Sequence, residues 1–368
     1  MTPFRDATGG PITTVIPMTD QTRIGEARRF AITLGDGGDE TAVGRVAIVT
    51  TELATNLIRH AKDGAMLLRR VAGAERSFDS IEVVAIDRGP GIADVSRSLR
   101  DGFSTHGTPG TGLGAVSRLT ERFDIYSLPG KGTIVSCQIP LADNQRARDA
   151  ANGDPIDVGV TCVPMGHEVA CGDGWCTHLG QSGTILAMVV DGLGHGPQAA
   201  QAADAAKEAF RQAVQRHVTP AEIVQLAHLA LRPTRGAALA VAEIDVARGT
   251  VHYAGIGNIS GAIIGVGRTQ NLVSLNGIAG HQVGRIREFA YEWTDGATLF
   301  MHSDGIATRW TLDEYPGLSS RHPSMRAAVI WREFSRGRDD ATVLAVRPHT
   351  PQTVSSGHSV SAPPMEVL

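Results

Sequence analysis

Residues 184–196 of this 368-residue chain read TILAMVVDGLGHG, an apolar run followed by an acidic, glycine-rich turn. The run from 184 to 190 is short, almost wholly apolar and β-branched at both ends, a pattern typical of a buried strand. The turn then presents the carboxylate of Asp191 and the imidazole of His195 among three glycines. We therefore predict a strand that carries Asp191 to one edge of a sheet.

Three more acidic motifs occur in the same half of the chain: GDG around Asp173, SDG around Asp304, and RDD around Asp339 and Asp340. A single Asp-Gly pair is most often an ordinary turn. These aspartates flank apolar runs, however, so folding could gather them at one sheet edge, where their charges would repel unless a cation neutralised them. Because carboxylate oxygens suit Mg²⁺ or Mn²⁺ better than zinc or copper, we predict a divalent-cation site.

Strands and helices are mixed on both sides of these motifs. The apolar pattern of the C-terminal half predicts an alanine-rich helix over 197–214, with proline in its first turn, and strands over 237–244, 250–254, 297–301 and 342–347. The N-terminal half is predicted to hold helices over 43–61 and 114–123 and strands over 81–86 and 133–139. Both halves are therefore predicted to be α+β.

Three motifs in the N-terminal half suit a nucleotide. Glu52 and Asn56 stand four residues apart and share one face of the predicted helix, although this spacing is common on any helix surface. The text DRGPG, residues 87–91, ends a strand with a carboxylate and two glycines, which suits either close approach of a ligand or an ordinary turn. The loop GTPGTGLG, residues 107–114, offers backbone N–H groups to phosphates before a helix begins. It is neither a P-loop nor a dinucleotide-binding glycine pattern.

The chain is long enough for two domains of about 150 residues each. Polar, turn-rich residues 143–155 predict a linker between a domain over 12–142 and a second domain over 156–347. Residues 348–368 are rich in Ser, Thr and Pro and hold little to bury, so we expect a disordered tail.

Composition excludes several classes of protein. A net charge of -4 and a pI near 6.3 give no sign of a nucleic-acid partner or an anionic membrane partner. The four cysteines do not have the spacing of a disulfide framework or of a structural zinc site. The longest apolar run, 185–190, is too short to cross a membrane, and the first 18 residues lack the apolar segment of a signal peptide. We expect a cytoplasmic protein with reduced thiols.

Taken in order, the motifs between residues 52 and 133 resemble the GHKL ATPases, most closely the switch-protein serine kinases of the RsbW/RsbT type. The text DGFST at 101–105, followed by the glycine loop, is similar to RsbT in particular. The resemblance implies an α/β sandwich, with helices on a mixed sheet, that binds ATP and Mg²⁺. It implies a general base for serine phosphorylation at Glu52, a Mg²⁺ ligand at Asn56, adenine contacts at Asp87, Gly91 and Thr133, and a phosphate cradle at Gly110, Gly112 and Gly114. A histidine kinase is disfavoured, because His60 on the Glu52 helix follows Asn56.

The stretch from about 157 to 347 resembles the metal-dependent serine/threonine phosphatases of the SpoIIE/RsbX type, through DGLGHG from 191, SDG from 303, TRGA from 234 and GIGN from 255. The resemblance implies a PPM-type α-β-β-α sandwich with two Mn²⁺ or Mg²⁺ ions. It implies that Asp191 is catalytic and bridges both ions, that Asp173 and the Gly192 carbonyl bind one of them, and that Asp304 and Asp339 bind the other. It implies no metal role for Asp340. His195 is either a contact of the substrate, as leaving-group acid or phosphate ligand, or a structural residue of its turn.

Together the two resemblances imply a bifunctional regulator in which a serine kinase-like, ATP-binding module is fused to a phosphoserine/phosphothreonine phosphatase. The implied partners are STAS-domain antagonist phosphoproteins of a bacterial partner-switching pathway, with a sigma-factor regulator as a further candidate; the oligomeric state stays open. A tether would raise the effective concentration of a docked substrate at both sites. One alternative keeps the phosphatase alone as the enzyme, with the ATP-binding module as a sensor or docking platform. The other is a non-catalytic, anti-sigma-like binding protein.

Overall fold

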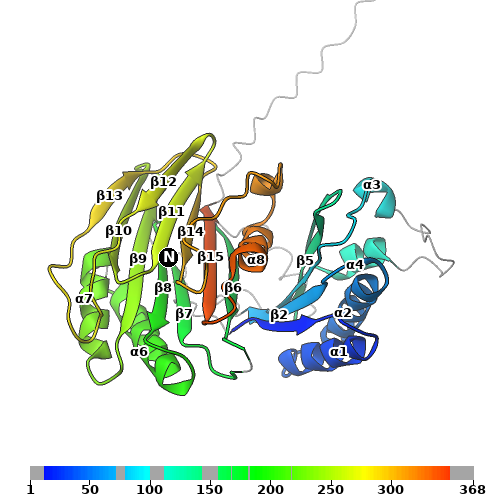
Figure 1. Ribbon diagram of the computed structural model, residues 1–368, viewed down its shortest axis with the longest axis horizontal. Coiled ribbons are helices and arrows are strands. Elements are labelled where there is room, and N and C mark those ends of the chain that lie inside the picture. The colour runs from blue at the N-terminus through cyan, green and yellow to red at the C-terminus, as the bar shows by residue number, and fades with distance from the viewer. Residues whose placement is uncertain are drawn as a thin grey trace, which may run out of the picture.

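The computed structural model describes residues 12–71, 79–99, 112–142, 156–166, 168–180, 183–216 and 218–348. The chain forms an N-terminal and a C-terminal body, which together contain three five-stranded sheets (Figure 1). The predicted linker, residues 143–155, lies outside the described residues, as does the predicted tail except for Pro348, the last residue of a strand.

The N-terminal body is a layer of helices on one sheet. In chain order its elements are β1 (Thr14–Pro17), α1 (Thr22–Leu34), α2 (Glu40–His60), β2 (Ala65–Val71), β3 (Ser80–Ile86), α3 (Val95–Ser98), α4 (Leu113–Leu119), β4 (Arg122–Leu128) and β5 (Gly132–Pro140). The sheet order is β1-β2-β3-β5-β4, and all four pairings are antiparallel. The prediction of a mixed sheet is therefore wrong for the described strands. A single crossover helix between two neighbouring strands makes them parallel. Here two helices, α1 and α2, connect β1 to β2, and the two strands are antiparallel.

Helix α2 forms because its apolar residues follow the helical repeat and its start is capped. The Asp39 carboxylate accepts the backbone N–H of Ala42 at 2.7 Å, which satisfies one of the free donors of the first turn. Val46, Leu53 and Leu57 are buried against the sheet, each stabilising the fold by about 1.5–3 kcal/mol. This face fixes the rotation of α2 and so leaves Glu52 and Asn56 half-buried on another face.

The predicted helix over 114–123 is wrong at its C-terminal end. Helix α4 stops at Leu119, and Thr120 adopts an extended conformation. From Arg122 onward the chain pairs with β5, so hydrogen bonds to a neighbouring strand override the local helical pattern.

The C-terminal body has two sheets packed face to face, with helices outside each sheet, as predicted. In chain order its elements are β6 (Ile156–Val163), β7 (Asp173–Leu179), β8 (Ile185–Gly192), α6 (Pro197–Val214), α7 (Pro220–Leu231), β9 (Ala237–Asp245), β10 (Thr250–Ile256), β11 (Ser260–Gly265), β12 (Arg268–Leu272), β13 (Phe289–Glu292), β14 (Thr298–His302), the 3₁₀ helix η1 (Leu318–Ser320), α8 (Pro323–Phe334) and β15 (Ala341–Pro348). The sheet orders are β13-β10-β9-β8-β7 and β12-β11-β14-β15-β6. Helices α6 and α7 cover the first sheet, and α8 covers the second.

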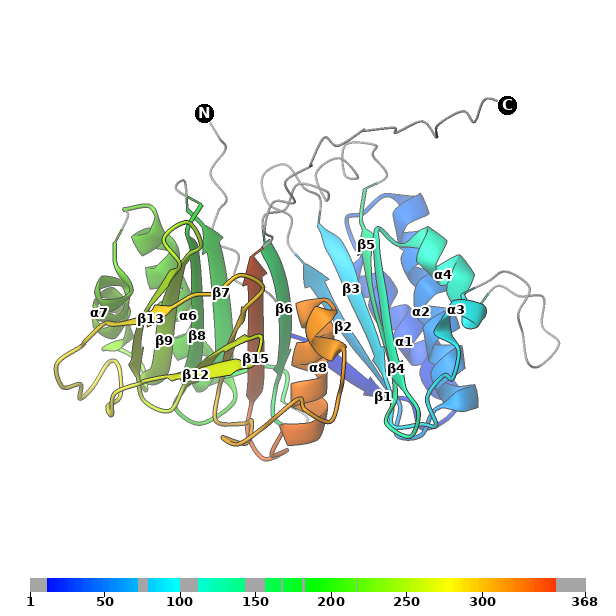
Figure 2. The same cartoon turned by 90° about the horizontal axis from the view of Figure 1, so that it is seen from above.

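Helix α8 also contacts the N-terminal body, so that it lies between two sheets (Figure 2). Its Met325 and Val329 pack with Leu67, Val84 and Ile86, which point from the N-terminal sheet away from α1 and α2. The sheet face opposite the α1–α2 layer is therefore covered by the C-terminal body.

A buried group of charged residues accompanies this apolar contact. Glu82 on β3 is almost fully buried and accepts hydrogen bonds from Arg69 at 2.5 Å, Arg122 at 3.0 Å and the hydroxyl of Ser324 at 2.5 Å. The two arginines lower the pKa of Glu82 to about 2 against the effect of its burial. Because a buried carboxylate left without its partners is strongly destabilising, these contacts hold α8 in one position on the sheet.

His322, the residue that caps α8, is buried in the same interface. It faces Glu82 on β3, Arg122 and Asp124 on β4, and Asp157 on β6. Burial and the charge of Arg122 lower the pKa of His322 to about 4, although the two carboxylates Asp157 and Glu82 act in the opposite direction. His322 is therefore neutral in the folded protein at neutral pH.

We expect the folded state to lose stability as the pH falls from 6.5 towards 4. In that range the unfolded chain binds a proton at His322 and the folded chain does not, so the free energy of unfolding falls by about 3 kcal/mol. Urea unfolding at several pH values measures this loss. In His322→Asn, which keeps an N-cap but cannot titrate, the pH dependence should be smaller by that amount; equal slopes in parent and variant would contradict the assignment.

Candidate active sites

The first candidate site surrounds the turn after β3. Asp87 is buried, and its carboxylate accepts the backbone N–H of Gly89 at 2.6 Å. Burial raises the pKa of Asp87, while hydrogen bonds from the backbones of Gly89 and Thr133 and the charge of Arg332 act against this rise. The residue is thus a sheltered carboxyl group at the end of a strand, a suitable acceptor for an amino group on a planar ring.

Two glycines allow the backbone to pack closely around the turn that carries Asp87. Gly91 has a φ of +77° and Gly132 a φ of +95°, conformations that L side chains rarely adopt. A Cβ on Gly132 would lie 2.0 Å from the carbonyl oxygen of Asp87, and one on Gly91 would lie 2.5 Å from that of Leu128. The predicted adenine-binding residue Thr133 stands here too, its hydroxyl 2.8 Å from that of Ser127. The structure therefore brings Asp87, Gly91 and Thr133 together.

The end of α2 lies beside this turn. A Cβ on Gly89 would be 3.2 Å from both the Cα of Ala61 and the carbonyl oxygen of His60, the last residue of α2. Asn56 is about one turn earlier on this helix and Glu52 about two turns earlier. Their helix therefore flanks the predicted adenine pocket.

Only part of the predicted phosphate cradle is described. Gly112 is the N-cap of α4 and Gly114 lies in its first turn, next to α2. Gly110 lies outside the described residues. The phosphate-binding role of these glycines stays a prediction.

Exchanging Asp87 for asparagine should weaken ADP binding about 10- to 150-fold, because a hydrogen bond to a charged group is worth about 1.5–3 kcal/mol. Calorimetric titration with Mg²⁺ and ADP measures the change. Asp63→Asn is the matched control, since Asp63 is exposed and its φ of 51° suits asparagine. Equal affinity in the parent and Asp87→Asn would count against the pocket.

The second candidate site is an acidic centre at one edge of the C-terminal body. Asp173 begins β7, Asp191 lies near the end of β8, and the two are direct partners across the antiparallel pair. Ser303 reaches Asp173 from the second sheet, its hydroxyl donating to Oδ2 at 2.6 Å. The two sheets therefore meet at this point.

The remaining acidic residues arrive from strand ends of the second sheet. Asp304 follows β14 and accepts a hydrogen bond from the side chain of Asn258 at 2.6 Å. Asp339 precedes β15, and its carboxylate accepts the backbone N–H of Asp340 at 2.9 Å. The carboxylate of Asp340 instead accepts the backbone N–H groups of Met165 at 2.6 Å and Gly172 at 2.7 Å. Asp340 thus fixes the loop before Asp173.

The electrostatics of this centre favour cations. Burial raises the pKa of Asp191, and the charges of Asp173, Asp304, Asp339 and Asp340 raise it further. Burial also raises the pKa of Asp173, with a smaller effect from Asp340, although hydrogen bonding from Ser303 acts in the opposite direction. The pairing of Asp173 with Asp191, and the contacts of Ser303 with Asp173 and Thr342, bring the ends of β7, β8, β14 and β15 to one region.

The carboxylates of the acidic centre are of the type that binds divalent cations, although they are not yet close enough together to coordinate one. Within the described ranges, no three His, Cys, Asp or Glu side chains converge closely enough to form a ready-made metal site. However, Oδ1 of Asp173 is buried without a hydrogen-bond partner, and the like charges repel one another. Oxygen ligands that need neutralisation suit Mg²⁺ or Mn²⁺. Gly192 must be glycine, because a Cβ there would lie 2.3 Å from the carbonyl oxygen of Ala199 on α6.

Sequence reasoning assigned no role to three residues that support this centre. The hydroxyl of Ser303 donates to the carboxylate of Asp173 and accepts the backbone N–H of Thr342 at 2.9 Å, so it links the two strands. Asn258 orients Asp304, and Glu168 lies 3.0 Å from the Nδ1 of His195. Ser303 and Asn258 stand in the SDG and GIGN motifs, so the motifs contained the signal. Glu168 had none, because only the fold brings its loop to His195.

The C-terminal turn of α8 contacts the first site. The guanidinium of Arg332 donates to the carbonyl oxygen of Asp87. Arg88, which follows Asp87 in the chain, donates to the carbonyl oxygen of Arg332 at 2.9 Å and forms an ion pair with Glu333 at 2.6 Å. The turn that carries the predicted adenine ligand is thus attached to α8.

The residues that follow α8 are attached to the acidic centre. The backbone N–H of Arg336 donates to the carbonyl oxygen of Gly305 at 2.8 Å, and that of Ala307 to Phe334 at 2.8 Å. Gly305 directly follows Asp304, and Arg336 stands three residues before Asp339. The end of α8 therefore connects both candidate sites.

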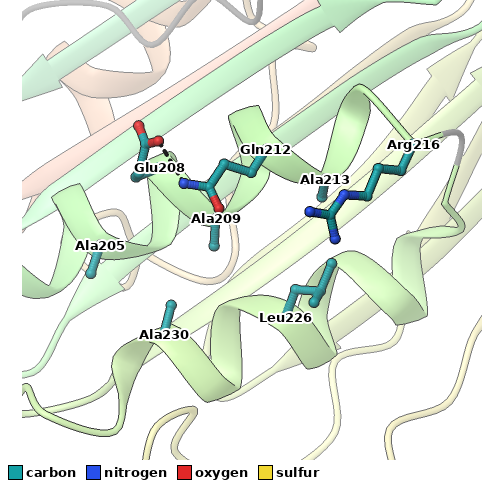
Figure 3. A pocket seen from close by; sticks show the side chains of 8 residues that line it. All are labelled: Ala205, Glu208, Ala209, Gln212, Ala213, Arg216, Leu226 and Ala230. Atoms are coloured by element: carbon teal, nitrogen blue, oxygen red, sulfur yellow. Dashed lines mark hydrogen bonds between the residues drawn. The ribbon is translucent and has the colours of Figure 1, made fainter.

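A groove of about 300 Å³ lies elsewhere, between α6 and α7 (Figure 3). It contains no aspartate of the acidic centre; its lining residues are Ala205, Glu208, Ala209, Gln212, Ala213, Arg216, Leu226 and Ala230. In the described part of the chain, no helix has the length and apolar content needed to cross a bilayer.

The fold and its two sites define a GHKL-type ATP-binding module joined to a metal-dependent protein serine/threonine phosphatase domain of the PPM type. The family model of the histidine kinase-like ATPase domain matches residues 18–139, and that of Stage II sporulation protein E (SpoIIE) matches residues 181–349. The serine/threonine-protein kinase RsbT of Bacillus subtilis (strain 168) is 38% identical over 106 residues, which are 29% of this chain and 77% of RsbT. Through this stretch the chain belongs to the RsbT family.

Several solved structures resemble this chain over half of its length or more. A structure described as "The bacterial stressosome: a modular system that has been adapted to control secondary messenger signaling" is 28% identical, with a TM-score of 0.48 over 52% of this chain and 99% of that one. RsbX in complex with magnesium is 17% identical, with a TM-score of 0.46 over 54% and 97% of the two chains. The phosphatase domain of Bacillus subtilis SpoIIE with a regulatory fragment is 14% identical, with a TM-score of 0.44 over 90% and 97%.

Proposed function

We propose that the chain phosphorylates and dephosphorylates serine or threonine on STAS-domain proteins of a partner-switching pathway, using its two modules in opposition. The observation that carries the phosphatase half is the cross-strand pair Asp173–Asp191, joined by Asp304 and Asp339 in one charge-coupled centre. The relationship to the RsbT kinase and the sheltered Asp87 pocket support the kinase half.

In the ATP-binding module, Asp87 would accept the adenine amino group and Asn56 would hold Mg²⁺. Glu52 would take the proton of the attacking hydroxyl, a contribution of about 10²- to 10⁴-fold. Most of the remaining barrier in phosphoryl transfer is lowered by positioning and by neutralising phosphate charge. The glycines at the start of α4 would provide the backbone donors for this neutralisation.

In the phosphatase module, Asp173, Asp191 and the Gly192 carbonyl would hold one Mn²⁺ or Mg²⁺ ion, and Asp191, Asp304 and Asp339 the other. When bound, such ions supply a water of lowered pKa and neutralise the phosphate. The protein's own contribution is orientation: Ser303 fixes Asp173, Asn258 fixes Asp304, and Asp340 fixes the loop before Asp173.

Incubation with γ-³²P-labelled ATP and a purified STAS-domain protein tests the proposal, first with Mg²⁺ alone and then after adding Mn²⁺. We expect label to transfer to the protein and then to be released as phosphate. Release from a separately phosphorylated protein without any transfer would leave the phosphatase as the only enzyme. Neither transfer nor release would favour a binding protein.

A second candidate function, in which the ATP-binding module senses nucleotide for the phosphatase, is favoured by the position of α8. Arg332 on its last turn holds the Asp87 turn, and the following residues hold the segments beside Asp304 and Asp339. A nucleotide that moves the Asp87 turn would therefore act on the second site through a short, rigid path. Such coupling between two sites is typically 5- to 150-fold in affinity and is reciprocal.

We expect Mn²⁺ at the phosphatase site to change the affinity for ADP, measured by calorimetry in excess Mg²⁺, at least about fivefold. Asp191→Ala should lose this shift, because it removes the site through which Mn²⁺ acts. Arg332→Ala should reduce the shift while both ligands still bind, whereas the exposed Arg309→Ala should not. An identical ADP affinity with and without Mn²⁺ in the parent would exclude the sensor.

A further inference from the structure

Trp310, in the segment between β14 and η1, contacts the strand end that carries Asp304. It is half-buried, and its indole N–H donates to Nε2 of His302 at 3.0 Å. Its ring packs edge-on against that of Phe300, with 5.3 Å between the ring centroids. His302 is the last residue of β14, is almost fully buried and stands two residues before Asp304. The tryptophan is therefore linked through one histidine to the predicted cation ligand.

The contacts of His302 fix which nitrogen of its ring carries the proton. An indole N–H can only donate, so Nε2 of His302 accepts this bond and holds no hydrogen. The proton is therefore on Nδ1, which lies 2.9 Å from the carbonyl oxygen of Ser303, a group that can only accept. Both partners select the same neutral tautomer, so the bond from Trp310 makes His302 a donor to the Ser303 carbonyl.

The carbonyl of Ser303 belongs to the peptide bond that leads into Asp304. It also accepts the backbone N–H of Ile306 at 3.3 Å, which closes the turn, so two donors hold this oxygen. Because the peptide unit is planar, a fixed carbonyl also fixes the direction in which the chain enters Asp304. The hydroxyl of the same serine donates to Asp173 at 2.6 Å. The orientation of Ser303 therefore affects two of the predicted cation ligands.

We propose that Trp310 is a positioning residue of the phosphatase site, which acts through His302 to hold the Ser303–Asp304 peptide in the orientation that cation binding needs. The proposal rests on the phosphatase function proposed above and adds two residues to its machinery. Like charges in the acidic centre repel one another while no cation is bound, so an unrestrained Asp304 would be free to turn away from its neighbours. Side chains that orient metal ligands from outside the coordination shell commonly have large effects on metal affinity.

A purely structural role for Trp310 can be separated from this one. Its ring also packs against an apolar cluster that includes Phe300, Ile306 and, on α8, Ile330. Phenylalanine keeps an aromatic ring in this cluster but has no N–H, so Trp310→Phe removes the hydrogen bond and retains most of the packing. Trp331 packs against the same cluster, and it is not a hydrogen-bond partner of His302, whose two ring nitrogens face Trp310 and Ser303. Trp331→Phe is therefore the matched control.

Long-range ¹⁵N–¹H correlation spectra of the full chain in EDTA report the tautomer of His302, whose signals are those missing from His302→Asn. We expect only the Nδ1–H tautomer in the parent and in Trp331→Phe, whereas the Nε2–H tautomer should become detectable in Trp310→Phe. Calorimetric titration with Mn²⁺ without nucleotide should show an affinity about 3- to 10-fold lower in Trp310→Phe, the equivalent of about one neutral hydrogen bond. Trp331→Phe should bind Mn²⁺ as the parent does.

Hydrolysis of p-nitrophenyl phosphate gives a kinetic measurement of the same effect. In Trp310→Phe the Mn²⁺ concentration for half-maximal rate should rise about 3- to 10-fold, while kcat at saturating Mn²⁺ stays near the parent value. His302→Asn removes the acceptor of the indole N–H, so adding Trp310→Phe to it should cause no further loss.

Two results would overturn the positioning role: an Nε2–H tautomer of His302 in the parent, or a Trp310→Phe variant that binds Mn²⁺ as tightly as Trp331→Phe. A further loss on adding Trp310→Phe to His302→Asn would also contradict it, because the tryptophan would then act by another route. A parent that neither binds Mn²⁺ nor hydrolyses p-nitrophenyl phosphate would instead refute the phosphatase function itself.

Discussion

The Asp191→Ala variant is expected to lose at least about 10³-fold in Mn²⁺-dependent hydrolysis of a phosphoserine substrate. Asp191 is the one carboxylate assigned to both cations, and such ions contribute several kcal/mol to the stabilisation of developing charge. Burial and the neighbouring charges of Asp173 and Asp304 raise the pKa of Asp191, which marks it as the carboxylate most in need of a cation. Steady-state release of phosphate at saturating Mn²⁺ measures the loss.

Folding and nucleotide binding should survive this substitution. Asp191 is half-buried and lies at the end of β8 in the C-terminal body, outside the nucleotide site, so ADP affinity in Mg²⁺ without Mn²⁺ should match that of the parent. Asp204→Ala, on the exposed side of α6, is the matched acidic control and should keep full hydrolysis. A fully active Asp191→Ala would remove the two-cation centre altogether.

Glu52→Gln is expected to bind ADP normally and to transfer phosphate about 10²- to 10⁴-fold more slowly. The amide keeps the size and hydrogen-bonding reach of the side chain but cannot accept the proton of the attacking hydroxyl. The initial rate of label transfer from γ-³²P-ATP to a STAS-domain protein measures the effect. Asp191→Ala as a background prevents release of the label from masking transfer.

The same helix supplies a control for this experiment. Glu40 lies in the first turn of α2, exposed and more than two turns before Glu52, so Glu40→Gln should phosphorylate at the parent rate. Rapid transfer by Glu52→Gln would reject its role as the base. If the parent itself transfers no label, the ATP-binding module is better described as the sensor attached to α8.

Local pattern was sufficient for the elements that are apolar on a regular repeat. The helix predicted over 197–214 has the same bounds as α6. The strand predicted over 184–190 begins one residue before β8, which starts at Ile185. Pattern was insufficient where pairing decides the conformation. Residues 120–123 have the apolar spacing of a helix, yet β4 begins at Arg122 and pairs with β5. The positions of the helices in the sequence also could not show that β1 and β2 are antiparallel.

The linear order of residues by itself determined which chemical groups this protein has: a carboxyl followed by glycines after one strand, and four strand-flanking aspartates in the other half. That is because such motifs depend on a strand end and a turn, which neighbouring residues specify. Only the tertiary structure decided that α8 fits between two sheets, that Ser303 reaches Asp173, and that Glu168 meets His195. Those contacts join residues far apart in the chain, and their free energy exists only once the three sheets are packed together.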